Sequence, residues 1–335
     1  MTGGQVSSAP LVSVGIPVFN GEATIRETLE SVLNQTYKNL EVLVYNNGST
    51  DGTEAVVLDI ARRDARVTCR SGDANQGASR SFNETFRMST GPYFMWVASD
   101  DQLDVLFVES GVALLEANPS IGASVPIVEA YLEGHEGLVY EVRFQGFEPD
   151  KPTLEKLIRS IRELPGTCIY GLFRSEVLER SELWTPVYMS DVALVQELAL
   201  RTAIVCNADQ RLRYNMADRW KTTAEELSLF VGDKLPRGLV PPAFLLLRER
   251  IRRLGTVAPT RRRWVLYSAV VICAEMWRLG WRALWRVARK LLGHRILRPL
   301  GVYWYWRHML PDFTRVIDRN AFEGRIVLPT LGLER

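Results

Sequence analysis

Two adjacent carboxylates stand directly behind a long apolar run. Residues 93–98 read Tyr-Phe-Met-Trp-Val-Ala, and Ser99, Asp100 and Asp101 follow them. An uninterrupted apolar run of this length is typical of a strand buried on both faces of a parallel sheet. Open α/β sheets bind ligands beyond the carboxyl ends of their strands, and carboxylate oxygens suit Mg²⁺ or Mn²⁺ that carries a diphosphate. The pair therefore indicates a metal–diphosphate site; the other interpretation is that it solvates a loop or caps a helix.

Two more polar clusters follow apolar runs earlier in the chain. Phe19 and Asn20 end the run 11–20, and Asn46 and Asn47 follow the run 40–45. A further short strand is expected at 66–70, and the spacing of apolar residues predicts helices at 21–33, 53–65 and 79–88. This alternation predicts a parallel sheet with right-handed crossovers. Because the carboxyl ends of parallel strands share one edge, we expect the three clusters to converge on one crevice.

The second half of the chain gives weaker signals. The sequence predicts helices at 110–118, 243–254 and 261–292, a strand at 122–132 and a strand-and-helix segment at 171–178. Residues 140–152 read as irregular. No G-x-G-x-x-G or Walker A pattern occurs, which argues against a dehydrogenase or a P-loop enzyme.

The motif series resembles the opening of the inverting family 2 glycosyltransferases, which have the GT-A fold. It consists of PVFNGE at 17–22, SVLNQTY at 31–37, NNGSTDGT at 46–53 and DD at 100–101. The similarity covers roughly residues 11–104 and continues more weakly to about 217. It implies a mostly parallel, Rossmann-like α/β sheet flanked by helices, a nucleotide-diphospho-sugar donor and a Mn²⁺ or Mg²⁺ cofactor.

The resemblance assigns the first motif to the donor. Pro17, Phe19 and Asn20 match a turn that lies against the nucleotide base, and Glu22 belongs to the same motif. Phe19 offers a flat ring for stacking a pyrimidine, a contact worth about 1–3 kcal/mol in nucleic-acid systems; the alternative is that it packs under the strand end. Glu22 also stands in the first turn of the expected helix, where the helix dipole favours a negative charge.

Asn47 aligns with a family aspartate that accepts a hydrogen bond from uracil. Both acids expected there are amides in this chain, Asn46 and Asn47. An amide still pairs with the base but without the charge that roughly doubles such a bond. A UDP-sugar is therefore the favoured donor, and dTDP and GDP remain open. Asp51 is expected to cap the following helix or its loop, whereas Arg80 either reaches the diphosphate or lies on a solvated helix face.

The resemblance also assigns the catalytic carboxylates. Asp101 is expected to ligate the cation, and Asp100 to contact the ribose or the ligand shell of the metal. Asp191 matches the acid that opens a helix and acts as general base, taking the proton from the acceptor hydroxyl; the alternative is a simple N-cap. Glu197 lies six residues further on, off the same helical face, which makes Asp191 the better candidate.

The 335 residues leave room for one large domain and an appendage. We expect a flexible N-terminus at 1–10, a catalytic domain at 11–220 and a helical, Arg- and Trp-rich extension at 221–335. The catalytic domain divides into a nucleotide-sugar half, 11–104, and an acceptor half, 105–220. The four cysteines form no CxxC or Cys/His cluster, so each is interpreted as a reduced core residue rather than a disulfide or zinc ligand.

The extension carries an uneven charge. After Glu275 no acid occurs before Asp312, and eight Lys and Arg residues stand between them with interleaved tryptophans. Three interpretations fit: an anionic membrane surface bound through 264–310, packing onto the catalytic domain, or a homodimer formed through these helices. Nothing else suggests nucleic-acid binding.

The chain shows neither a signal peptide nor an apolar run long enough to span a bilayer. The longest strongly apolar window, 264–274, has only 11 residues. We therefore expect a cytoplasmic protein, either free or peripheral on the inner face of the cell membrane.

The sequence thus predicts a metal-dependent inverting glycosyltransferase that acts on a glycan or a lipid-linked acceptor. The alternative is a non-catalytic nucleotide-sugar-binding or scaffold subunit of a glycan-assembly complex. The Asn46-Asn47 substitution keeps that alternative open, whereas the presence of Asp100, Asp101 and Asp191 argues against it.

Overall fold

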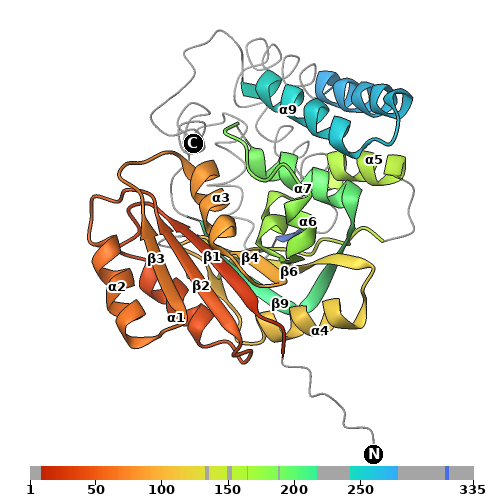
Figure 1. The fold of residues 1–335 in the computed structure, drawn as a ribbon. Coiled ribbons are helices and arrows are strands. Elements are labelled where there is room, and N and C mark those ends of the chain that lie inside the picture. The colour runs from red at the N-terminus through yellow and green to blue at the C-terminus, as the bar shows by residue number, and fades with distance from the viewer. Residues whose placement is uncertain are drawn as a thin grey trace, which may run out of the picture.

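The computed structural model describes residues 9–132, 136–148, 153–163, 165–187, 189–216, 242–277 and 314–316. These residues form one mixed sheet of ten strands with helices on both faces (Figure 1). The main path of the sheet runs β10-β7-β6-β8-β4-β1-β2-β3, and β9 pairs with β5 and β6. The flexible N-terminus that we predict at 1–10 lies almost wholly outside the described residues.

The first half of the sheet is parallel, as predicted. β1 (Val12–Val18) pairs with β2 (Leu40–Asn46) and β4 (Tyr93–Trp96), and β2 pairs with β3 (Val67–Ser71). The register sets Val18 opposite Asn46 and Asn46 opposite Ser71, so these strands end at the same edge. All residues of β1 and β4 are buried, which explains their unbroken apolar character.

Two apolar clusters cover the two faces of this sheet. On one face, α1 (Ile25–Leu33), α2 (Thr53–Arg63) and α4 (Phe107–Ala117) contribute to a cluster with Val12, Val14 and Ile16. On the other face, α3 (Ala78–Met88), α6 (Ser175–Glu179) and α7 (Ser190–Arg201) enclose Phe94 and Trp96. Because helices cover both faces of the sheet, the edge at which the strands end is the place left for a ligand site.

Two helix starts differ from the sequence prediction. α1 begins at Ile25 rather than at residue 21, because residues 21–24 form a turn in which Thr24 N–H donates to Gly21 C=O. α4 begins at Phe107 rather than at residue 110. Residues 102–103, close behind the paired carboxylates, form the short strand β5 (Gln102–Leu103) and not a helix, so the interpretation of Asp100-Asp101 as a helix cap is wrong.

The second half completes the sheet with longer strands. β6 (Ile121–Leu132) pairs antiparallel with β7 (Leu138–Val142) and β8 (Leu172–Arg174), and parallel with β9 (Ala203–Met216). The expected irregular stretch 140–152 is therefore partly wrong, since its first residues belong to β7. The strand and helix predicted at 171–178 are confirmed as β8 and α6.

The described part of the C-terminal extension packs on two helices from the second half of the predicted catalytic domain, 105–220. α9 (Pro242–Val257) and the helix at 261–277 share an apolar cluster with α5 (Thr153–Glu163) and Leu200 of α7 (Figure 1). Trp277, at the end of this described part, is 68% exposed. The eight Lys and Arg residues and the other interleaved tryptophans, at 278–310, lie outside the described residues, so the packing of that segment stays a prediction. β10 (Thr314–Val316) adds an edge strand to β7, which periodicity does not foresee.

Two predictions from composition are checked on the described residues. None of their helices is long and apolar enough to cross a membrane. The cysteines Cys69, Cys168, Cys206 and Cys273 are free thiols, and burial raises the pKa of the Cys168 thiol well above its usual value. Only Cys168 is a buried core residue; Cys69 and Cys206 are partly buried and Cys273 is exposed, so the interpretation of all four as core residues is wrong for Cys273.

Candidate active site

Asp101 is a fully buried carboxylate at the end of β4. The chain turns directly after the strand, with Val97 N–H donating to Gly15 C=O and Asp101 N–H to Ala98 C=O. Asp101 Oδ1 accepts a hydrogen bond from the Asn215 backbone N–H at 3.0 Å, whereas Oδ2 is buried and has no hydrogen-bond partner. Burial raises the pKa of the Asp101 carboxyl well above its usual range, and the charge of Asp100 raises it further.

This orphaned oxygen fits a divalent cation. A buried carboxylate oxygen without a donor or a counter-charge is costly, and a cation bound to it would supply the missing charge. No group of three or more His, Cys, Asp or Glu among the described residues could hold a metal alone. Mg²⁺ and Mn²⁺ sites that use one or two carboxylates and complete their shell with phosphate oxygens meet this description.

Asn215, far from Asp101 in the sequence, holds the turn that carries Asp100 and Asp101. Its side-chain Nδ2 donates to the Asp100 carbonyl at 2.5 Å, and its backbone N–H holds Asp101 Oδ1. The pairing of β9 with β5, in which Arg213 lies opposite Gln102, brings it there. Sequence analysis missed this residue, because more than a hundred residues separate it from Asp101 and no local pattern marks it.

We expect Asn215→Ala to weaken divalent-cation binding about 10- to 100-fold, as loss of residues that orient metal ligands typically does. The reason is that the Asp100 carbonyl loses its donor and the turn that aims Asp101 loosens. Titration of Mn²⁺ followed by electron paramagnetic resonance measures this without turnover. Asn118→Ala, at an exposed residue that bonds only within its own helix end, serves as the control; equal Mn²⁺ affinities of the two variants would contradict the role of Asn215.

Asp191 stands in the first turn of α7. The residue that caps this helix is Met189, with a left-handed backbone at φ 54°, so Asp191 is not the N-cap that the alternative interpretation requires. Its side chain lies against the 3₁₀ turn at Gly166–Tyr170: a Cβ on Gly166 would stand 2.2 Å from Asp191 Oδ2. Glycine at 166 therefore leaves the space that the carboxylate occupies.

Two tyrosines, Tyr170 and Tyr214, feel the charge of Asp191 as well as that of the paired carboxylates. Burial raises the pKa of the Tyr170 and Tyr214 hydroxyls well above their usual values, and the negative charges of Asp101, Asp100 and Asp191 raise both further. Tyr170 ends the same 3₁₀ turn that Asp191 touches at Gly166, and such a turn of five residues spans about 8 Å. The charges of all three predicted carboxylates thus act on the same two tyrosine hydroxyls, which sequence analysis did not single out.

The loop 19–22 lies beside this cluster. A Cβ on Gly21 would stand 3.5 Å from Ser99 Oγ, immediately before Asp100. Phe19 remains 41% exposed at the end of β1, so it does not pack under the strand. Pro17 lies within β1, opposite Tyr45. An exposed ring at this edge is available for stacking.

Asn20 and Glu22 join this loop to the turn after β2. Asn20 Oδ1 accepts from Thr50 N–H at 2.9 Å, and Glu22 Oε2 accepts from Gly52 N–H at 2.9 Å. Asp51 in turn accepts from the backbone N–H groups of Glu22 and Thr53. These bonds give Asn20, Glu22 and Asp51 a structural role in holding two loops together; direct contact of Asn20 or Glu22 with a donor stays a prediction.

The Asn47 amide is occupied by a third loop. It is 2% exposed, its Nδ2 donates to Asn75 Oδ1 at 2.8 Å, and its Oδ1 accepts from Gln76 N–H at 3.1 Å. Gly48, with φ at 70°, lets the turn approach Ala74, because a Cβ there would stand 2.6 Å from the Ala74 backbone. The amide that replaces the expected acid therefore braces the start of α3, and its pairing with a base stays a prediction.

Arg80 is not drawn into the carboxylate cluster. Its side chain is 52% exposed, and its Nε lies 3.9 Å from Glu84 Oε1 one turn along α3. This placement favours the solvated helix face over the diphosphate contact.

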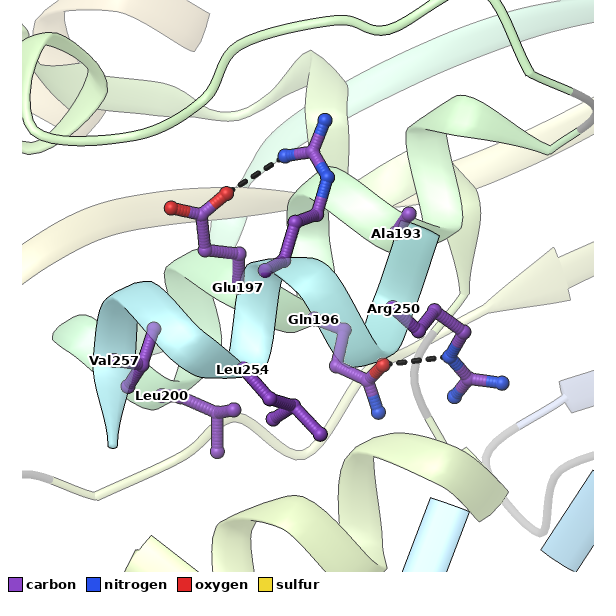
Figure 2. Close-up of a pocket in the computed structure, with 8 residues that line it drawn as sticks. Ala193, Gln196, Glu197, Leu200, Arg250, Leu254 and Val257 are labelled. Atoms are coloured by element: carbon purple, nitrogen blue, oxygen red, sulfur yellow. Dashed lines mark hydrogen bonds and ion pairs between the residues drawn. The ribbon is translucent and has the colours of Figure 1, made fainter. Parts of the chain in front are cut away.

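Glu197 has a different role from Asp191. Its buried carboxylate pairs with Arg253 of α9 at 2.7 Å and with Arg201 at 2.8 Å. Figure 2 shows the pocket between α7 and α9. The Glu197–Arg253 ion pair and the Gln196–Arg250 hydrogen bond both join α7 to α9 there. This pocket is lined by Leu200, Leu254 and Val257 and by none of the three predicted carboxylates. These ion pairs give Glu197 a structural role, and the role of Asp191 as general base stays a prediction.

Comparison with known proteins gives consistent matches. Residues 13–182 match the family model described as Glycosyl transferase family 2. An uncharacterized glycosyltransferase of Haemophilus influenzae is 35% identical over 134 residues, which are 40% of this chain and 42% of that protein. Glycosyltransferase GlyA of Streptococcus pneumoniae is 34% identical over 99 residues, 30% of this chain and 14% of GlyA. The chain thus matches less than half the length of these relatives.

A solved structure shares the fold. The crystal structure of S. aureus TarS 1-349 in complex with UDP-GlcNAc superposes with a TM-score of 0.57 at 17% sequence identity, covering 78% of this chain and 72% of that chain. The mixed sheet with helices on both faces is therefore a GT-A fold, as the sequence predicts.

Proposed function

The chain belongs to glycosyl transferase family 2, and from that premise we propose that it transfers a sugar, with inversion, from a nucleotide-diphospho-sugar to a hydroxyl of a glycan or lipid-linked acceptor. The observation that carries this proposal is the buried, orphaned Asp101 oxygen at the carboxyl edge of the sheet, next to Asp100 in the chain. A UDP-sugar is the favoured donor, a choice that the UDP-GlcNAc complex of TarS supports.

Asp191 is the proposed general base. It takes the proton of the acceptor hydroxyl while that oxygen bonds to the anomeric carbon, and the electron pair of the breaking glycosidic bond leaves with the nucleoside diphosphate. Asp101, with Asp100, would hold the cation, which when bound supplies positive charge to the diphosphate oxygens. Phe19 would stack on the base.

A donor panel with and without Mn²⁺ tests the proposal. We expect a UDP-sugar with Mn²⁺ to raise the melting temperature, since ligand at 100 times its Kd stabilises the folded state by about 2.7 kcal/mol. Release of UDP should then require the cation. Asp101→Asn should abolish both effects, whereas Asp59→Asn, on the solvent side of α2 in a surface ion pair, should leave both intact.

The outcomes separate two functions. If no donor in the panel shows cation-dependent release of its nucleotide, the enzyme proposal fails. If a nucleotide-sugar still raises the melting temperature, a non-catalytic binding subunit takes its place.

A further inference from the structure

The helix at 261–277 presents an apolar face to solvent. Val265 is 54% exposed, Leu266 48%, Ile272 39% and Met276 57%. At 100° per residue these positions fall on one side of the helix, together with the exposed residues Ala269 and Cys273. The opposite side, with Tyr267 and Val271, is buried in the cluster formed with α5 and α9. The helix therefore has an apolar side that faces solvent in addition to the side that is buried in this cluster.

This exposed face carries no charge over four turns. Between Trp264 and Trp277 the only Asp, Glu, Lys or Arg is Glu275, and it pairs with Arg250 of α9 on the covered side. Surface helices of soluble proteins normally place charged residues on the side that faces water. A contiguous exposed apolar face of this kind marks an interaction site.

Positive charge borders the same face. Arg261, Arg262 and Arg263 begin the helix and are exposed, and Arg262 lies one turn before Val265 and Leu266 on that side. The chain that continues beyond 277 contains eight Lys and Arg residues and no acid before Asp312. A partner for this region must accept apolar side chains and also present negative charge.

We propose that the face formed by Val265, Leu266, Ile272 and Met276 docks on an anionic lipid surface, with Arg261–Arg263 at the headgroups. A lipid interface offers both properties at once, because acyl chains accept the apolar side chains and acidic headgroups attract the arginines. Because α9 joins this helix to α7 through Arg250 and Arg253, docking also holds the Asp191 helix near the membrane. Such a position would suit transfer to a lipid-linked acceptor, a step that rests on the proposed function.

Vesicle sedimentation of the full chain tests the docking face. We expect binding to vesicles of phosphatidylcholine mixed with phosphatidylglycerol, weaker binding to phosphatidylcholine alone, and weaker binding at high salt. Replacing two exposed residues, Leu266→Glu with Ile272→Glu, should lower the affinity at least about tenfold, because two side chains lose their apolar burial. The double variant Arg261→Glu, Arg262→Glu should bind the anionic vesicles more weakly but should bind phosphatidylcholine vesicles as the unchanged chain does.

Leu58→Glu provides a matched control, because Leu58 is a 40% exposed apolar residue on α2, away from this face. It should bind vesicles as the unchanged chain does. Wild-type affinity of the Leu266→Glu, Ile272→Glu variant would overturn the proposal, because binding would then lie elsewhere in the chain. Absence of vesicle binding would also overturn it; self-association in sedimentation velocity, lost in that variant, would then assign the face to a second copy.

The same variant separates this inference from the proposed enzyme activity. Release of UDP from a free UDP-sugar needs no membrane, so the Leu266→Glu, Ile272→Glu variant should retain it. A chain that binds anionic vesicles but releases no nucleotide would refute the proposed function and leave the docking face intact.

Discussion

Asp191→Asn is expected to lower kcat about 100- to 10,000-fold, the range typical of losing a general base. Asparagine has nearly the same shape but cannot take the proton of the acceptor hydroxyl. Donor binding should persist, because Asp101 and the loop 19–22 are unchanged, so the melting-temperature shift with UDP-sugar and Mn²⁺ should match that of the unchanged chain. Steady-state release of UDP in the presence of acceptor measures the loss.

A second substitution tests the position of the carboxylate rather than its chemistry. In Gly166→Ala the new methyl group would stand 2.2 Å from Asp191 Oδ2, so the carboxylate must move. Because the side-chain end moves easily, the fold should be almost unaffected, while kcat falls by up to about 100-fold for a displacement near 1 Å.

Full activity of the first variant, Asp191→Asn, would show that another group serves as base.

Arg253→Met is expected to lower the free energy of unfolding by about 3–5 kcal/mol, since it removes one member of a buried ion pair. Arg253 is 2% exposed and holds Glu197 and Glu249, each at 2.7 Å, while its Nη2 donates to the Leu183 carbonyl. Without Arg253, the Glu197 carboxylate on α7 stays buried but loses this partner, and the ion pair that joins α7 to α9 is gone. Urea unfolding followed by circular dichroism measures the change.

Two controls define this effect. Arg248→Met, at an exposed position of the same helix, should stay within about 0.5 kcal/mol of the unchanged chain. The double variant Arg253→Met, Glu197→Leu should be less destabilised than the sum of its single variants, because the second change removes a buried charge that has lost one of its two arginine partners. Strict additivity would mean that the two residues act independently.

The first half of the fold was accessible from local patterns. The apolar runs before Asn46 and Asp100 correspond to β2 and β4, and the runs and periodic segments between residues 12 and 96 agree with the observed elements to within a few residues. The start of α1 was not accessible, because the turn at 21–24 is held by bonds to Asp51, Gly52 and Thr53 across two loops. The short strands β5 and β10 exist only through their partners.

The sequence by itself determined the parallel half-sheet and the acids that stand at its edge, because apolar periodicity and motif order are local properties of the chain. Only the tertiary structure decided that Asn215 holds the Asp101 turn, that the Asn47 amide braces residues 75–77, and that Arg253 fixes the Asp191 helix through Glu197. Each of these contacts joins segments at least 28 residues apart, and no short-range pattern encodes such a pairing. A buried polar atom takes whichever partner the packed core brings within hydrogen-bond distance, and that partner is known only when the core is complete.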